Sequence, residues 1–288
     1  MHKTLILTGL FSLAAIFAPL QNSSVSAADK KSNATTVGKK PKQPVYRLPK
    51  DPKTPMIVLD YRGGFTPPKI SQAATLSIFP DGTVVIPKKF ANTKAYKGKL
   101  SQGELQSLLH FIIGTNEFFK YDQATVVQEI QKEKQRIAAA GGAIFRLADA
   151  ATVEIQVIAN EKTNQATYYP SGIDESKIKG LKQRAVIQRR LQQVMSTVQL
   201  GGKAKVSGWL KMANDALVAQ HPKAKPLTLD DFQSGAERAN GSTYINFSRS
   251  KLGPNGKPVP NHLTNVFINR LAQGKAKINV VYRRPAGK

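Results

Sequence analysis

The fold class is decided by residues 76–86, which read LSIFPDGTVVI. Apolar residues alternate with polar neighbours on both sides of Asp81-Gly82, and this pattern predicts two short antiparallel strands. An Asp-Gly pair is a strong signal for a tight hairpin turn, because Gly tolerates positive φ and Asp can bond to its own backbone. We therefore interpret Asp81 as a turn residue and not as a catalytic acid.

A helix is predicted to follow this hairpin. Ser101 and Glu104 have the spacing of a capping box, and Leu100 can pack against Leu105 as a hydrophobic staple. The apolar residues after this start recur on one helical face at Leu105, Leu108, Leu109, Ile112 and Ile113. His110 lies beside this stripe with no second ligand at helical spacing, so we interpret it as a surface or core-edge residue.

Helices and hairpins continue to alternate up to residue 202. Residues 122–140 are typical of a helix that ends at Gly141-Gly142, and residues 152–158 and 166–169 of a second hairpin. Residues 174–199 give the longest helical pattern. Gly201-Gly202-Lys203 follows a helix rather than a strand, which favours a C-terminal cap over a phosphate-binding loop. We predict an α+β domain over residues 56–202.

A smaller basic α+β domain is predicted over residues 203–288. The periodic pattern weakens over 203–225, and Thr228 with Asp231 then repeats the capping device and predicts a helix start. Residues 243–247, 266–271 and 277–282 are typical of strands. The predicted fold class is therefore α+β, with two small antiparallel sheet-and-helix units behind a disordered basic N-terminal tether.

The N-terminus has the pattern of an export signal. His2 and Lys3 precede an apolar stretch at 5–20, and Val25-Ser26-Ala27 provides small residues for cleavage. A stretch of 16 residues is shorter than the ~20 that span a bilayer, so we predict a signal peptide at 1–27 and no transmembrane segment after its removal. Residues 28–55, rich in Lys and Pro, are predicted to form the tether.

Cysteine is absent from all 288 residues. This excludes disulfides, Cys-ligated zinc and thiol nucleophiles. An exported chain that holds together without disulfides fits a bacterial periplasm, cell envelope or exterior better than a eukaryotic secretory route, where small domains are usually cross-linked.

Several short motifs follow one another in a fixed order over about residues 56–173. They are Ile78-Phe79-Pro80-Asp81-Gly82-Thr83-Val84-Val85, Gly98-Lys99-Leu100-Ser101, Glu104-Leu105, Phe118-Phe119, Ala148-Asp149-Ala150, Val153-Glu154-Ile155 and Tyr168-Tyr169. In this order they resemble a module of exported bacterial proteins without assigned activity, with residues 122–142 as an insertion. The resemblance implies an exported α+β module and transfers no catalytic residues.

Motifs that carry chemistry are absent from the sequence. No G-x-S-x-G, H-E-x-x-H, Walker A or G-x-G-x-x-G pattern occurs, and the histidines are too dispersed to have ligand spacing. We expect no catalytic residues, no metal site and no cofactor. A hydrolase of cell-wall or polysaccharide material that works through carboxylates stays open as an alternative, because such sites leave little trace in sequence.

Charge is the most informative feature. The formal net charge is +25, and residues 238–288 hold ten Lys or Arg and no Asp or Glu. Such a region repels itself, and an anionic surface would relieve the repulsion. The sequence predicts association with an anionic envelope polymer or an acidic protein. The candidate polyanion-binding residues are Arg249, Lys251, Arg270, Lys275, Lys277, Arg283 and Arg284.

Two other roles compete with this prediction. Tyr244, Phe247, Phe267 and Tyr282 lie among basic residues as base-stacking platforms would, but strand aromatics more often form a core, and export removes the chain from most nucleic acid. A structural assembly subunit is a further alternative, which would require a large apolar patch or an unprotected strand edge. The oligomeric state is not predicted.

Overall fold

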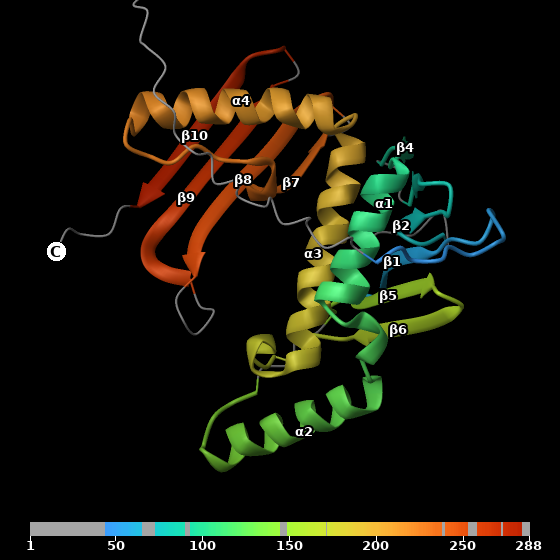
Figure 1. Ribbon diagram of the computed structural model, residues 1–288. Helices are drawn as coiled ribbons and strands as arrows, with labels where there is room; N and C mark the ends of the chain where they lie inside the picture. Colours follow the sequence, from blue (N-terminus) through green and yellow to red (C-terminus); the bar gives the residue numbers. More distant parts are fainter. Residues whose placement is uncertain are drawn as a thin grey trace, which may run out of the picture. The chain divides into compact units, whose positions relative to one another are not determined.

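The computed structural model describes residues 44–64, 73–89, 93–144, 149–170, 172–237, 240–252, 258–271 and 273–283. For residues 250–252, 258–263 and 283 it describes only the backbone. The predicted signal peptide at 1–27 and tether residues 28–43 lie outside the described residues. Helices accompany two antiparallel sheets, so the predicted α+β class is confirmed (Figure 1).

The first sheet has six strands in the order β4-β3-β2-β1-β5-β6. Their bounds are β1 Ile57–Arg62, β2 Leu76–Ile78, β3 Thr83–Ile86, β4 Tyr96–Lys99, β5 Thr152–Ala159 and β6 Lys162–Tyr168. Both predicted hairpins are present. In the first, the Asp81 carboxylate accepts a hydrogen bond from the Thr83 amide at 2.9 Å, and Gly82 has a φ of 84°. Strand β1 joins the two hairpins by pairing with β2 and β5.

Helices α1 Gln102–Leu109, α2 Gln123–Ala139 and α3 Lys179–Gln199 accompany this sheet. The capping box at Ser101 and Glu104 is formed, and a π-helical segment at His110–Thr115 continues α1. The predicted C-terminal cap of α3 is also present, since the Gly202 amide donates to the Thr197 carbonyl at 2.8 Å. Fully buried residues from the strands and from α1 and α3 form one hydrophobic core, which includes Leu59, Leu76, Leu105, Ile155 and Leu181.

The end of the predicted tether needs correction. Tyr46 is only 6% exposed and belongs to the core of the first sheet. Its backbone amide donates to Gln106 Oε1 at 2.8 Å, and its carbonyl accepts from Gln106 Nε2 at 3.0 Å. Because burial of this ring and pairing of its backbone offset the entropy of ordering, residues 44–55 do not behave as part of an extended leader.

The second sheet has four strands in the order β10-β9-β8-β7. Their bounds are β7 Phe232–Glu237, β8 Thr243–Leu252, β9 Pro258–Arg270 and β10 Ala276–Arg283. Helix α4, Lys203–Gln220, lies along one face (Figure 1). Its Leu217 packs with Phe247, Val266 and Ile268 in a second, smaller hydrophobic cluster.

One helix in this part was not predicted, and one predicted helix is absent. Residues 203–225, where the periodicity weakens, contain the full 18-residue helix α4. Thr228 and Asp231 do form a capping box, but it encloses only a single 3-10 turn, Leu229–Asp231, before strand β7 begins. Phe232 is buried in the second cluster and pairs with Phe247 on β8, so tertiary packing overrides the local helix signal.

Residues 43–288 form one compact unit that contains both hydrophobic clusters. Separate folding of 56–202 and 203–288 therefore stays a prediction. None of the helices in the described ranges is long and apolar enough to cross a membrane.

Candidate functional site

The four-stranded sheet has two chemically different faces. Ile245, Phe247, Val266 and Ile268 are buried in the cluster that includes α4 residues. Because side chains alternate along a strand, their sequence neighbours point to the opposite side. We call that side the open face; it is formed by Ser234, Ala236, Tyr244, Asn246, Ser248, Asn265, Phe267, Asn269, Lys277, Asn279 and Val281.

Phe267 lies near the centre of the open face and is surrounded by amides. It is paired across the strands with Asn246 on β8 and with Asn279 on β10. Phe267 is 37% exposed and Val281 is 38% exposed, so solvent reaches the middle of the sheet. An exposed aromatic ring among side-chain amides provides both an apolar surface and hydrogen-bonding groups.

Two of these amides have incomplete hydrogen bonding. Asn246 Oδ1 and Asn265 Oδ1 are inaccessible to solvent and have no hydrogen-bond partner. Among the described residues, only one other buried side-chain polar atom, Arg184 Nε, has no partner. An unsatisfied buried acceptor costs about 1–3 kcal/mol. Two such atoms on one sheet face require an explanation.

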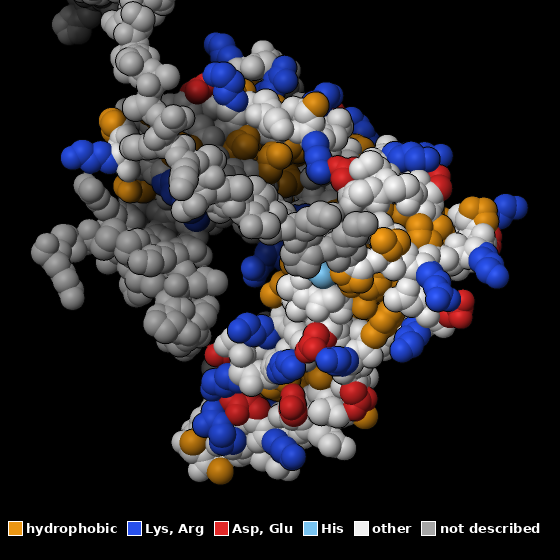
Figure 2. Space-filling model, viewed as in Figure 1, with side chains coloured by type: hydrophobic (Ala, Val, Ile, Leu, Met, Phe, Trp, Pro, Cys, Tyr) orange, Lys and Arg blue, Asp and Glu red, His pale blue; other side chains and the backbone are white. Residues whose placement is uncertain are grey.

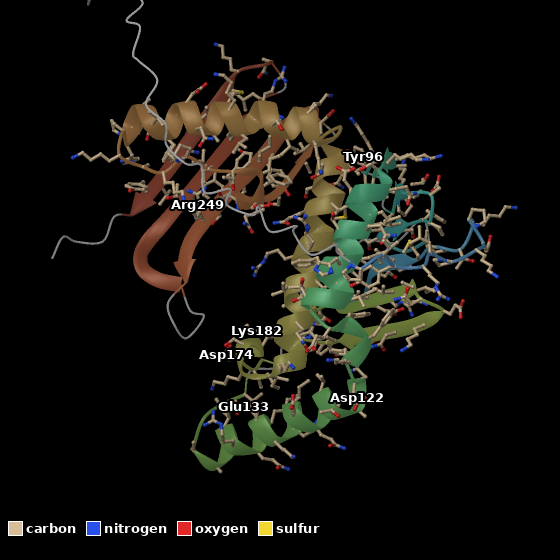
Figure 3. The ribbon with its side chains drawn as sticks, in the orientation of Figure 1. Tyr96, Asp122, Glu133, Asp174, Lys182 and Arg249 are labelled. Carbon is tan, nitrogen blue, oxygen red and sulfur yellow. The ribbon has the colours of Figure 1, made fainter. Side chains whose placement is uncertain are left out.

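Arg249, one of the predicted polyanion-binding residues, has internal partners instead. Its side chain lies on the α4 face with Phe247 and forms an ion pair with Asp231. The Nη2 and Nη1 groups also donate to the carbonyls of Pro226 at 2.7 Å and Lys225 at 3.2 Å (Figure 3). Arg249 therefore ties the 3-10 turn to β8, and few of its donors are left for a polymer.

The other predicted residues divide into two groups. Arg270, Lys275 and Lys277 are exposed at the turn end of the β9–β10 hairpin. Lys277 lies on the open face, whereas Arg270 lies on the other face with its guanidinium 6.0 Å from the Trp209 ring centroid. The side chains of Lys251 and Arg283, and all of Arg284, lie outside the described residues.

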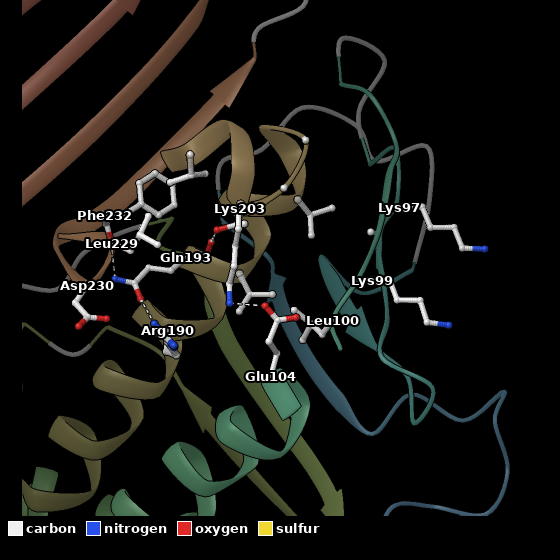
Figure 4. A pocket seen from close by; sticks show the side chains of 17 residues that line it. Lys97, Lys99, Leu100, Glu104, Arg190, Gln193, Lys203, Leu229, Asp230 and Phe232 are labelled. Atoms are coloured by element: carbon white, nitrogen blue, oxygen red, sulfur yellow. Dashed lines mark hydrogen bonds and ion pairs between the residues drawn. The ribbon is translucent and has the colours of Figure 1, made fainter. Parts of the chain in front are cut away.

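A cavity of about 500 Å³ lies where α3 meets α4. Its apolar lining includes Leu100, Val198 and Phe232. Across its opening, Lys203 at the start of α4 forms an ion pair with Glu104 of α1, while Lys97 and Lys99 extend away from this pair (Figure 4). The hydrogen bond from Lys203, with another from the Ser101 amide, lowers the pKa of Glu104 to about 2.

The polar groups in this cavity mostly satisfy one another. Gln193 donates to the Phe232 carbonyl at 2.7 Å and accepts from Arg190 at 3.3 Å. A carboxylate that stays charged and ion-paired, as Glu104 does, is a poor general acid. Gly202, confirmed as part of the α3 cap, also lines the cavity. This geometry favours a structural junction between helices over a catalytic site.

A second pair of carboxylates lies on the first sheet. Asp60 and Glu154 are buried and face each other across β1 and β5. Burial alone would raise the pKa of Asp60, but hydrogen bonds from Lys89 and Thr75 and the charge of Lys89 lower it overall. Glu154 pairs with Arg62 at 3.0 Å. The hydrolase alternative requires an uncompensated carboxylate pair, whereas Asp60 and Glu154 are neutralised by Lys89 and Arg62.

A smaller cavity of about 280 Å³ contains Arg184, whose side chain is 3% exposed. Its guanidinium lies 4.3 Å from the Tyr168 ring centroid and donates to Glu175 at 2.7 Å. The buried cation thus already has a carboxylate and an aromatic partner.

Within the described ranges, no three His, Asp or Glu side chains are grouped as a metal ion would require. Comparison with protein families, curated proteins and solved structures finds no match for this chain. The resemblance to an exported module therefore stays a prediction. Sequence reasoning missed Asn246 and Asn265. Only strand register places Asn246 beside Phe267, whereas Asn265 shares a strand face with Phe267 by alternation along β9.

Proposed function

We propose that this chain is an exported, non-enzymatic envelope or extracellular protein that associates electrostatically with acidic polymers or an acidic partner. The observation that carries the proposal is the charge of residues 238–288, ten basic and no acidic side chains. Much of this segment forms a sheet with one face open to solvent. Export itself rests on the N-terminal sequence pattern.

The accessible cations at the hairpin end support this function. Arg270, Lys275 and Lys277 are exposed and have no carboxylate near them in sequence, so their mutual repulsion favours an anionic ligand. Arg249 already binds Asp231, so the proposal relies on Arg270, Lys275 and Lys277. Electrostatic association of this kind displaces counterions, and its affinity falls as salt rises.

A binding titration tests the proposal. The chain without residues 1–27 is titrated with inorganic polyphosphate and with polygalacturonate at several salt concentrations between 50 and 300 mM. We expect affinity to fall linearly with the logarithm of salt concentration. Simultaneous Arg270→Glu, Lys275→Glu and Lys277→Glu substitution should reduce affinity more than tenfold at the lowest salt.

The matched control reverses three exposed lysines elsewhere, Lys132, Lys162 and Lys182, and so changes the net charge by the same amount. Equal weakening by both triple variants, or by neither, would contradict this assignment of the site. Fractionation of producing cells tests export, which the recovery of a chain retaining Met1 in the cytosol would overturn.

A further inference from the structure

We infer that the open face recognises a hydroxyl-bearing acidic glycan, with Asn246, Asn265 and Phe267 as contact residues. The inference rests on the proposed function and adds the chemical class of the polymer. A polymer of uronic acid units has the required chemistry: sugar rings with an apolar C–H face, several hydroxyl groups and a carboxylate on each unit.

The unpaired amide oxygens select a ligand with hydrogen-bond donors. Asn246 Oδ1 and Asn265 Oδ1 are acceptors, so a group that only accepts, such as a polyphosphate oxygen, cannot satisfy them. A sugar hydroxyl can donate to an amide oxygen. Both asparagine residues are only half-buried. Rotation about χ2, a torsion with broad minima, can therefore turn each amide towards solvent. This rotation breaks no hydrogen bond of Oδ1, because Oδ1 accepts none.

Phe267 supplies the apolar surface. Phe267 is 37% exposed and lies between Asn246 and Asn279 on the neighbouring strands. Asn265 and Asn269 are two residues away from it on its own strand. Ligand sites commonly combine an aromatic surface with a few oriented polar groups. The C–H face of a sugar ring on Phe267 would bring the ring hydroxyls over the surrounding amides.

The charge distribution fits a glycan better than a nucleic acid. Among the residues that the structure describes on the open face, Lys277 is the one cation, and it lies at the end of the sheet. Single-stranded nucleic acid is bound along a positively charged groove that follows its backbone. A face that is neutral at its centre and basic at its end suits a chain whose hydroxyls contact the amides and whose carboxylate reaches Lys277.

Substitutions on the open face test the inference. Affinity for polygalacturonate is measured for Phe267→Ala and Asn265→Ala, with polyphosphate, neutral dextran and single-stranded DNA as parallel ligands. Loss of apolar contact in Phe267→Ala should weaken polygalacturonate binding about fivefold. Loss of one hydrogen bond in Asn265→Ala should weaken it about three- to tenfold. Polyphosphate binding should not change in either variant.

Val218→Ala is the matched control, since Val218 is similarly exposed, at 43%, and lies on α4. The urea midpoint of Asn265→Ala should equal or exceed that of the wild type, because the substitution removes an unsatisfied acceptor. A lower midpoint would assign Asn265 a structural role and overturn its assignment as a contact.

The outcomes separate this inference from the proposed function. If polyphosphate and polygalacturonate bind equally and neither variant matters, the glycan inference fails and electrostatic association stands. If single-stranded DNA alone loses affinity in Phe267→Ala, the face binds nucleic acid and the inference also fails. If no anionic polymer binds at low salt, the proposed function fails first.

Discussion

The two sheets differ in how fully they satisfy their own charges and polar groups. On the first sheet, the buried carboxylates of Asp60 and Glu154 bind Lys89 and Arg62. On the second, Asn246 and Asn265 have buried oxygens without partners. The buried carboxylates of the first sheet have their partners within the chain, and the unpaired buried side-chain atom near this sheet, among the described residues, is Arg184 Nε of α3. The second sheet keeps two unpaired amide oxygens on one face.

The charged surface shows the same contrast. Over α2 the acidic and basic side chains are interspersed, and Glu133 pairs with both Arg136 and Lys177 (Figure 2). In the second sheet, Arg249 of β8 forms its ion pair with Asp231, which precedes β7 in the chain. Among the described residues, most ion pairs lie around the larger core, whereas the smaller one has fewer, such as Arg249–Asp231 and Lys211–Asp215.

The largest expected effect comes from the smaller core. Phe247 is fully buried, with its ring centroid 5.7 Å from that of Phe232, and Phe247→Ala should lower stability by about 3–5 kcal/mol. Trp209, the only tryptophan, packs against the same cluster, so its fluorescence reports on the second sheet. We expect the urea transition seen by fluorescence to move below the one seen by far-UV circular dichroism.

Leu59→Ala in the first core is the paired variant and should move the circular dichroism transition instead, by about 2–5 kcal/mol. Coincident transitions in both variants would show that the two sheets unfold as one cooperative unit. That result would contradict a difference in stability between the two sheets.

Local sequence signals predicted the first sheet well. The Asp81-Gly82 turn and the Ser101–Glu104 capping box are both present, because each depends on residues at most three positions apart. The pairing of strand β1 with both hairpins was not predicted. The register between strands that are distant in sequence leaves no local sequence pattern.

The candidate site could be predicted only in part. Charge counting alone found the basic C-terminal segment, but Arg249 shares parity with Ile245 and Phe247, and this face is covered by α4. The open face could not be predicted without the pairing of three strands. This pairing places Asn246 on β8 beside Phe267 on β9. Phe267, grouped with the core aromatics from its strand position, lies on the solvent side.

A smaller effect on stability should appear where α1 and α4 are linked, as pH changes. Glu104 of α1 pairs with Lys203 of α4, and its pKa is lowered from its usual value to about 2. A lowered folded pKa means that the pair stabilises the fold above the unfolded pKa, near 4.5, and that this contribution is lost as pH falls through 2. Since Lys203 is 64% exposed, we expect no more than about 1 kcal/mol.

The measurement is urea unfolding from pH 6 to pH 2 for the wild type and Glu104→Gln. Glutamine can keep the capping box with Ser101 but not the charge. The variant should lose less stability than the wild type over this range. Parallel pH profiles would show that Lys203 and Glu104 do not couple the two helices.

The smallest effect sharpens the comparison of charges. Lys277 lies on the edge strand β10 near Lys275 and Arg270, so Lys277→Glu should relieve repulsion and raise stability by about 0.2–0.5 kcal/mol at low salt. Lys162→Glu on edge strand β6 adds a second acid beside Glu161 and should not stabilise. Both effects should vanish in 1 M salt, where the Debye length is about 3 Å. If only Lys277→Glu is stabilising at low salt, then repulsion between the basic side chains destabilises the wild-type sheet. Such repulsion is expected on a surface that an anionic ligand neutralises.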